Sequence, residues 1–563
     1  MSKKLVALLM AAIMLCSFAS FASAEATYPE YLNLVDTYYP MVKEGYEDKV
    51  EIDVTIIVGT DFSADPSQRY FWQLMEKVFN IHFNVTQVTN KEEYITLTFA
   101  ADDLPDLILG AGLTPAQIYE YGVIEEQLLD VTPYLTPELA PQLNKLFEQY
   151  ADLRSTITLP NGAIYCFPNI RDYDNPENYT VTSINVKMME EVGVTEKPKT
   201  LDELVDLLYK FKALGDDVIP LCGAWENCNP SAMILNALGF ETKDHTVQTG
   251  SKVTVRNGEV VLPAADPVYK DYLELMNKFY TDGIIDKDFF TNDSIVLQAQ
   301  TAEKRIGVLG QRCYALNSNP DFYLDFESLP VLTSAQNSDP FCATSSSISF
   351  GGCLISSKTQ YPELLVRWCD WMVTYEGTNA AWVGANKYNE GIMLEGWGGW
   401  YMNENYSRCD VDRETYPEKW TGAVQYLREQ VAGFNMGSLG LVAGEDWYRQ
   451  TMSGLPYVDK TETWAKDPMN AGFYYRTSAY EEYTPYLRTD ISTISFFFDE
   501  DTTDRIIELE AVLKDKIENE TAKFITGARP LSEFDAFQEE LKKLGVEEYV
   551  GYYAESYAAT QGK

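Results

Sequence analysis

The chain of 563 residues is too long for one ordinary hydrophobic core, so we expect two domains, or two lobes built from discontinuous segments. A hydrophobic fraction of 45% and a charged fraction of 23% are typical of a globular protein and argue against an intrinsically disordered chain. The net charge of −41 argues against non-specific binding to nucleic acid or to an anionic membrane surface, because like charges repel, and we expect no nucleic-acid partner.

The N-terminus has the three parts of a secretory signal peptide. Two lysines stand at its start, an apolar run covers residues 5–15, and Ala-Ser-Ala occupies 22–24, so we expect residues 1–24 to be removed. Bulky residues precede Cys16, whereas small residues precede the acylated cysteine of a lipoprotein, so a lipid anchor at Cys16 is the less favoured alternative. We expect a secreted protein that is extracellular or associated with the cell surface.

Strands and helices alternate over the next part of the chain. β-Rich runs predict strands at 52–58, 81–88 and 106–109, and helical patterns occupy 67–80 and 91–104 between them. This alternation is typical of βαβ units and predicts a mostly parallel sheet. Glycine follows the first and the third strand, which favours loops at the carboxyl edge, where such sheets bind ligands.

The middle of the chain contains a segment that can join two lobes. A turn and a short strand at 160–168 predict a crossing between the lobes. Thr200 and Glu203 form a capping box that begins a helix. A short strand at 219–221 then leads to Trp225.

The second half of the chain continues this alternation. Strands are predicted at 305–309 and 349–356, and a helix at 362–375 with Gly377 just past its end. The inner face of that helix is predicted to hold Leu364, Trp368, Trp371 and Tyr375, so we expect its tryptophans in the core. The end of the chain is helical: Gly527 stops one helix with Ile506, Leu513, Ile517 and Phe524 on one face, and Ser532 caps another with Phe534, Phe537, Leu541 and Leu544 inside.

Histidine and cysteine usage excludes several kinds of site. The chain has two histidines, His82 and His245, which is too few for a Ser-His-Asp triad or a zinc site of several histidines. No Cys-x-x-Cys pair is present. Cys222 and Cys228 flank a short loop and can form a disulfide, although free thiols are an equal alternative in a protein of this size.

Several short motifs, in their order along the chain, resemble one protein family. The motifs are the Ala-Ala-Asp-Asp-Leu-Pro-Asp-Leu element at 100–107, the Asp-Val-Thr-Pro-Tyr segment within 128–141, the Asn-Gly-Ala-Ile-Tyr-Cys-Phe-Pro crossing at 161–168, the Pro-Lys-Thr-Leu-Asp-Glu-Leu helix start within 198–208, Asp-Gly-Ile-Ile-Asp at 282–286 and Lys-Phe-Ile-Thr-Gly at 523–527. Each motif alone is weak, but together they resemble the long family 1 extracellular solute-binding proteins of Gram-positive carbohydrate importers.

The resemblance implies an α/β fold of the type II periplasmic-binding-protein class, with two discontinuous lobes around a ligand cleft. The expected order is the signal peptide at 1–24, lobe I at 25–168, lobe II at 169–335, lobe I again at 336–400, and lobe II with the C-terminal helices at 401–563. The implied protein is a monomer and not an enzyme. Its implied partners are an oligosaccharide and the permease subunits of an ABC transporter.

The sequence departs from this family at one loop. Many relatives carry an Asp- and Asn-rich loop, suited to calcium, after the helix that corresponds to the one starting at Thr200. Here the chain reads Leu-Gly-Asp-Asp-Val-Ile-Pro at 214–220, and two carboxylates are too few for a calcium cage. We therefore expect no metal and no cofactor.

The candidate ligand contacts lie on loops that follow strands or contain glycine. Sugars present flat C–H faces and hydroxyl groups, so a sugar site needs aromatic rings and a few polar groups. The predicted contacts are Trp225, Trp397, Trp400, Arg171, Tyr173, Arg312, Gln311, Thr60 and Asp61. For each of them a structural role in the loop is the alternative.

Two other functions stay open at this point. A secreted glycoside hydrolase needs a pair of carboxylates across a sugar cleft, and no motif selects such a pair among the 85 acidic residues. A ligand-sensing protein that partners a membrane receptor would use the same fold as a transport protein.

Overall fold

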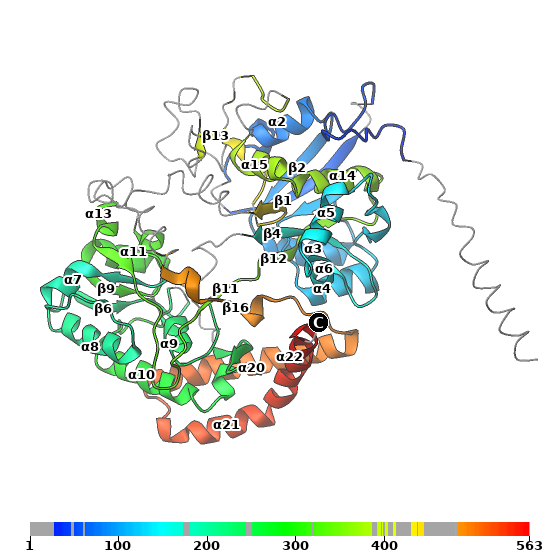
Figure 1. Cartoon of the computed structure of the whole chain (residues 1–563). Coiled ribbons are helices and arrows are strands. Elements are labelled where there is room, and N and C mark those ends of the chain that lie inside the picture. The colour runs from blue at the N-terminus through cyan, green and yellow to red at the C-terminus, as the bar shows by residue number, and fades with distance from the viewer. Residues whose placement is uncertain are drawn as a thin grey trace, which may run out of the picture.

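The computed structural model has two lobes joined by a narrow waist (Figure 1). It describes residues 28–561 except 47–49, 60–61, 173–180, 227, 244–249, 318–319, 385–390, 396, 398–399, 403–408, 412–429, 436, 444–478 and 480–481. The predicted signal peptide and Cys16 lie outside these residues. Within them, no helix combines the length and the apolar character needed to cross a membrane.

The first lobe is built on a mixed sheet. In the described part of the chain its six strands have the order β15-β4-β12-β3-β1-β2. Their bounds are β1 (Glu51–Ile57), β2 (His82–Val88), β3 (Leu107–Leu109), β4 (Cys166–Asp172), β12 (Ile348–Ile355) and β15 (Gly440–Ala443). β1 pairs in parallel with β2 and β3, whereas β12 is antiparallel to both β3 and β4. The strands β1 to β4 therefore point the same way.

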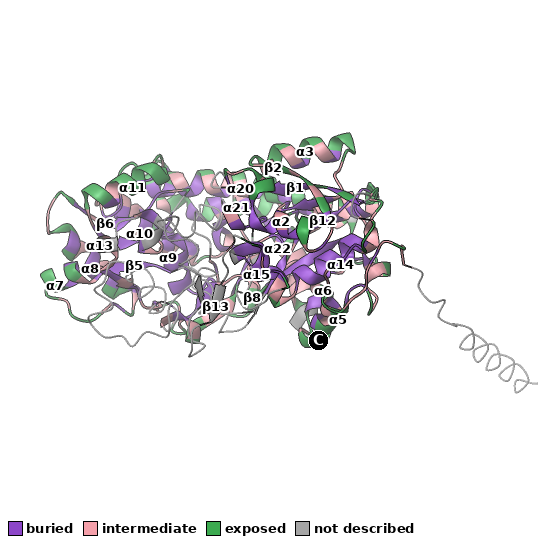
Figure 2. Ribbon diagram, turned by 90° about the horizontal axis from the view of Figure 1, so that it is seen from above, coloured by how far each residue is buried: buried purple, intermediate pink, exposed green. Residues whose placement is uncertain are grey.

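Helices cover both faces of this sheet. They are α2 (Tyr70–Lys77), α3 (Lys91–Ala101), α4 (Pro115–Tyr119), α5 (Pro141–Gln149), α6 (Leu153–Ile157), α14 (Pro362–Met372) and α15 (Tyr375–Val383). One core joins α2, α5 and α14 to the sheet, and a second core lies under α3 and α4. Figure 2 shows α14 as almost wholly buried, while α3 carries exposed residues on the outer surface.

The second lobe has a smaller sheet of order β10-β5-β9-β6 among the described strands. Their bounds are β5 (Ser183–Asn185), β6 (Val218–Cys222), β9 (Arg305–Leu309) and β10 (Phe326–Ser328). β6 and β9 are parallel and pair Cys222 with Leu309, so they end at the same edge. A hairpin of β7 (Thr254–Arg256) and β8 (Glu259–Val261) packs against the C-terminal helix α22 (Val546–Gln561).

Most helices of the second lobe share one core with its sheet. The helices that follow the strands are α7 (Val186–Glu191), α8 (Leu201–Lys212), α9 (Ser231–Ala237), α10 (Tyr269–Thr281), α11 (Ser294–Glu303), α12 (Cys313–Leu316) and α13 (Pro320–Tyr323). Among them, α11, α12 and α13 pack in a second core against β6 and β9. The C-terminal helices are α20 (Glu500–Thr526), α21 (Phe534–Lys543) and α22 (Val546–Gln561). Of these, α20 packs along α10 and α22 returns toward the first lobe (Figure 1).

The waist contains a short parallel pair of strands. β11 (Cys342–Thr344) pairs with β16 (Leu487–Thr489), and β11 leads directly into β12 of the first sheet. Figure 1 shows this pair between the two lobes. Few backbone connections of this kind leave two lobes able to move about a hinge.

Most of the predicted strands and helices are confirmed, with two local corrections. The helix predicted to run to residue 375 ends at Met372, because the Thr374 hydroxyl accepts a hydrogen bond from the Gly377 amide and begins α15. Tyr375 is consequently 38% exposed and does not belong to the buried stripe. Ser532 does not cap α21, whose N-cap is Glu533.

The order of the lobes along the chain is more interwoven than the predicted boundaries. β15 falls in the range predicted for lobe II, yet it pairs in parallel with β4 in the first sheet. Its four residues have no flanking signal that distinguishes a sheet strand from a loop. The predicted boundary after residue 168 is also wrong, because β4 continues in the first sheet to Asp172. The other predicted boundaries stay predictions.

Candidate functional site

The carboxyl ends of the strands define one edge in each lobe. In the first lobe β1, β2 and β3 end close together and β4 runs on past their ends, and in the second lobe β6 and β9 end together. Ligands of open α/β sheets bind outside such edges, because the loops there are free to vary. The loops that leave these strands form the candidate site.

Arg171 is the predicted contact that the structure describes at the edge of the first sheet. It lies in β4, and its amide donates to the Ser347 carbonyl at 2.6 Å. Its Nε donates to Oδ1 of Asn169 at 3.1 Å, and Asn169 is 1% exposed. A buried amide therefore orients a half-buried guanidinium, which can donate further hydrogen bonds to sugar hydroxyls.

A buried arginine that sequence reasoning missed holds the loop after β1. Arg69 is 0% exposed, and its Nη2 donates to the carbonyls of Phe62 and Ala64 and to Oε1 of Gln87 at 3.2, 2.7 and 2.6 Å. Burial lowers the pKa of Arg69 to about 10. Arginine is mostly exposed in proteins, so no sequence signal points to such a role. Three predicted contacts lie outside the described residues: Thr60 and Asp61 of this loop, and Tyr173.

Trp225 lies on the loop after β6 with its ring supported by two phenylalanines. Its amide donates to the Phe289 carbonyl at 2.8 Å. The ring centroid lies 6.2 Å from that of Phe289 and 5.0 Å from that of Phe290. The tryptophan as a whole is half-buried. A ring fixed in this way can stack on the C–H face of a sugar.

Gln311 and Arg312 lie at the same edge as Trp225. They follow β9, whose pairing with β6 places their loop beside the one that carries Trp225. The Ser183 hydroxyl donates to the Gln311 carbonyl at 2.8 Å, which fixes the backbone at this point. Both side chains are half-buried. The structure therefore brings three of the predicted contacts together in the second lobe.

The remaining two predicted contacts belong to another part of the first lobe. Trp397 is half-buried and meets Tyr70 edge to face, with ring centroids 5.6 Å apart. Tyr70 is 0% exposed, so Trp397 packs against the core, as expected for a packed turn. Trp400 begins β13 (Trp400–Met402), and its side chain is outside the description. Ligand contact by either tryptophan stays a prediction.

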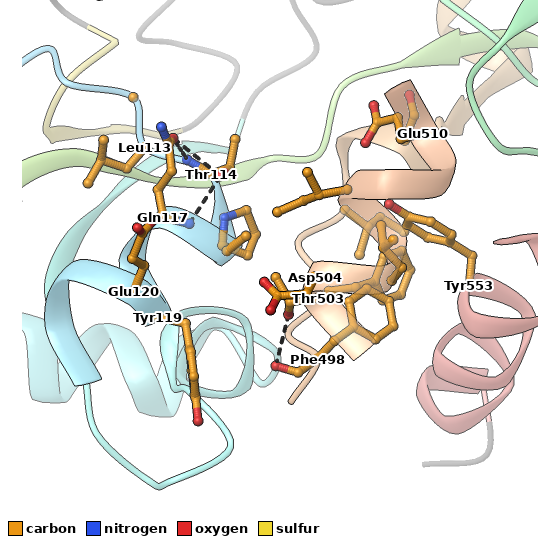
Figure 3. Close-up of a pocket in the computed structure, with 18 of the residues that line it drawn as sticks. Leu113, Thr114, Gln117, Tyr119, Glu120, Phe498, Thr503, Asp504, Glu510 and Tyr553 are labelled. Atoms are coloured by element: carbon orange, nitrogen blue, oxygen red, sulfur yellow. Dashed lines mark hydrogen bonds between the residues drawn. The ribbon is translucent and has the colours of Figure 1, made fainter. Parts of the chain in front are cut away.

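A cavity of about 890 Å³ forms a second place where the two lobes face each other (Figure 3). Figure 3 shows α4 on one side, with Thr114, Gln117 and Tyr119, and the start of α20 with Tyr553 of α22 on the other. The Thr114–Gln117 capping box orders the first wall, and Asp499 caps α20 in the second. None of the predicted contacts within the described residues lines this cavity.

The lining of this cavity mixes aromatic and charged side chains. Its aromatic residues are Tyr119, Phe496, Phe498, Tyr549 and Tyr553, and its charged residues are Lys91, Glu92, Glu120, Glu125, Lys252, Asp504 and Glu510. Rings and carboxylates of this kind suit a polar ligand, so the cavity is a competing location for a sugar. In the described residues, no group of three or more His, Cys, Asp or Glu side chains is placed to hold a metal ion.

Comparisons with known proteins agree on one kind of relative. No family model matches the chain. The fructooligosaccharide ABC transporter substrate-binding protein FusA of Streptococcus pneumoniae serotype 4 is 24% identical over 526 residues, which cover 88% of each sequence.

Solved structures match over an even larger share of the chain. An EF-hand mutant of S. pneumoniae FusA, in complex with fructo-nystose, has a TM-score of 0.69 at 20% identity and covers 91% of this chain and 99% of its own. A solute-binding protein from Bifidobacterium longum infantis, described as binding HMO and associated with an ABC transporter, has a TM-score of 0.68 at 16% identity over 90% of this chain and 98% of its own. The two-lobe α/β fold is thus the fold of solute-binding proteins.

Proposed function

We propose that this chain, which has the fold of the solute-binding proteins of ABC transporters, captures an oligosaccharide and delivers it to such a transporter. The observation that carries the proposal is the similarity to a fructooligosaccharide substrate-binding protein over 88% of both sequences. A match of that extent includes both lobes and the segments between them, so it is not the likeness of one shared domain. The relatives named above are binding proteins, which supports binding without turnover.

The ligand site of this proposal lies between the strand ends of the two lobes. Trp225 supplies a supported ring, and Gln311 and Arg312 supply polar groups beside it. Arg171 supplies a guanidinium at the edge of the first sheet. Apolar C–H faces and hydroxyl groups of a sugar match this combination, and closure of the lobes would remove the sugar from water.

Isothermal titration of the mature chain with oligosaccharides tests the proposal. Kestose and fructo-nystose come first, because FusA structures contain them, and a human milk oligosaccharide and an alginate fragment extend the panel. Trp225→Ala should weaken binding about tenfold, since a lost aromatic contact is worth on the order of 1 kcal/mol beyond area burial. A parent protein that binds none of these sugars would overturn the proposed ligand class.

The competing cavity supplies a matched control for this titration. Tyr119→Ala removes a half-buried ring from the cavity wall, as Trp225→Ala does at the strand ends. We expect Tyr119→Ala to bind like the parent. If Tyr119→Ala loses affinity and Trp225→Ala does not, the sugar binds in the cavity and the site assignment is wrong.

Export from the cell is part of the same proposal. The signal-peptide pattern at residues 1–24 and the similarity to a substrate-binding protein of an ABC transporter support it. The mass of the secreted chain tests it, since cleavage after Ala24 leaves Glu25 at the N-terminus and an acylated Cys16 does not.

A further inference from the structure

Two glycines at the edge of the second sheet are required by close packing and not by backbone conformation. Gly223 follows β6 and Gly310 follows β9, and neither is among the glycines with a positive φ. A Cβ built at either position would lie under 3.0 Å from the carbonyl oxygen of Cys228. That obstacle is backbone, which cannot rotate away as the end of a flexible side chain can.

The residue that both glycines contact has a strained backbone. Cys228 has a φ of 57°, in the left-handed region that few residues other than glycine adopt. Such conformations cost on the order of 1 kcal/mol and persist where the surroundings over-determine them, often at ligand sites. Burial raises the pKa of the Cys228 thiol, while amide groups of Gly310 and Gln311 act in the opposite direction, so the sulfur lies against the end of β9.

Asn229 continues this turn and reaches back to Trp225. It is 0% exposed, and its Nδ2 donates to the Trp225 carbonyl at 3.0 Å. Its Oδ1 accepts from the amide of Ser231 at 3.0 Å and from the Ser231 hydroxyl at 2.5 Å. That hydroxyl also shares a hydrogen bond of 2.6 Å with the Tyr272 hydroxyl of α10. Through the Ser231 amide, which begins the buried helix α9, the Asn229 side chain therefore connects the loop that carries the tryptophan to the core.

We infer that Gly223, Gly310 and Asn229 are positioning residues, which lock the turn at 228–230 against the ends of β6 and β9. The inference rests on the proposed function, because it concerns the residues that hold Trp225 in the ligand site. The turn fixes the backbone of the tryptophan and the residues after β9 in one arrangement before the sugar arrives. A site ordered in advance loses less conformational entropy on binding and binds more tightly.

A pair of glycine variants in the same strand region separates positioning from stability. Gly310→Ala forces the Cys228 carbonyl away from the strand end. Gly307→Ala is the control, because a Cβ there would meet the Phe211 ring and the Pro220 carbonyl inside the core, away from the turn. Both variants should lower the melting temperature, and Gly310→Ala alone should weaken sugar binding, by about tenfold.

A second pair keeps the test decisive if a glycine variant fails to fold. Asn229→Ala removes the hydrogen bond to the Trp225 carbonyl. Ser231→Ala removes a hydroxyl that binds Asn229 and Tyr272, but it leaves the Ser231 amide and the bond to Trp225 in place. We expect weaker sugar binding in Asn229→Ala and parent-like affinity in Ser231→Ala.

A readout without ligand distinguishes this inference from the proposed function. The chain has 10 tryptophans, and labelling with 5-fluorotryptophan gives each a fluorine resonance; the one lost in Trp225→Phe belongs to Trp225. That resonance should shift in Gly310→Ala and Asn229→Ala and stay in place in Gly307→Ala and Ser231→Ala. An unmoved resonance in the first two variants would overturn the inference even if the parent binds sugar. If the resonance shifts in these two variants but the parent protein binds no sugar, the positioning role stands and the oligosaccharide function is rejected.

Discussion

At the scale of single residues, one buried carboxylate joins three distant segments of the first lobe. Asp370 of α14 accepts hydrogen bonds from the Tyr38 hydroxyl at 2.7 Å, from the Gln142 amide at 3.1 Å and from the Leu143 amide at 2.7 Å. The Arg367 guanidinium lies over the Tyr38 ring, 4.1 Å from its centroid. Burial raises the pKa of Asp370 to about 6, although these hydrogen bonds and Arg367 act to lower it.

This raised pKa predicts a pH dependence of stability. The ordinary value is 3.8, so between about pH 4 and pH 6 the folded protein holds a proton that the unfolded chain has lost. The corresponding stabilisation is fully present below about pH 4 and is lost as the pH rises through about 6; it amounts to roughly 2–3 kcal/mol. Asp370→Asn is uncharged and should lack this contribution. Urea unfolding of the parent and the variant from pH 4 to 7 checks this prediction. If the difference in their free energies of unfolding stays constant over that range, the pKa of Asp370 is not raised.

At the scale of elements, local signals located most helices and strands but not every boundary. The Thr200–Glu203 capping box begins α8, and Gly527, with a φ of 77°, ends α20, as the sequence indicates. The end of α14 was misplaced, because the hydrophobic spacing continues to Tyr375 although Thr374 starts a new helix. A hydroxyl that caps a new helix can end the preceding one, and hydrophobic periodicity alone does not show whether a helix continues or a new one begins.

The two aromatic residues on either side of this boundary should differ sharply on truncation. Trp371 is 1% exposed and packs on Phe79, so Trp371→Ala should lower the free energy of unfolding by about 3–5 kcal/mol. Tyr375, placed on the same face by periodicity, is 38% exposed, and Tyr375→Ala should change stability by less than about 1 kcal/mol. Equilibrium denaturation measures both. Equal losses would mean that one continuous helix buries both side chains.

At the scale of the whole molecule, the sequence predicted the two-lobe class but not how the chain is distributed between the lobes. β12 enters the first sheet between β3 and β4 in the antiparallel direction, and β15 joins from a still later part of the chain. Hydrophobic patterns describe neighbours in sequence and carry no information on which distant strand will pair.

The sequence predicted some residues of the candidate site but not the turn that supports them. Trp225, Gln311 and Arg312 followed from their place after strands, and the parallel pairing of β6 and β9 brings them together. The turn that supports them could not be predicted from the sequence. Gly223 and Gly310 are needed because they contact the Cys228 carbonyl, and that contact exists only in the folded lobe.

The last expectation concerns metal. FusA carries an EF-hand, which is altered in the mutant named above, whereas here α8 ends in a turn with exposed Asp216 and Asp217. Calcium usually takes six to eight oxygen ligands, so two exposed carboxylates do not form a structural site. An ion that binds only the folded state raises the melting midpoint, by an amount that grows with the ratio of its concentration to its Kd. Thermal melts in excess EDTA and in millimolar calcium should therefore coincide. A bound sugar should raise the midpoint in the same assay, which shows that the method detects ligands. A calcium-dependent rise of several degrees would reveal a metal site and contradict this expectation.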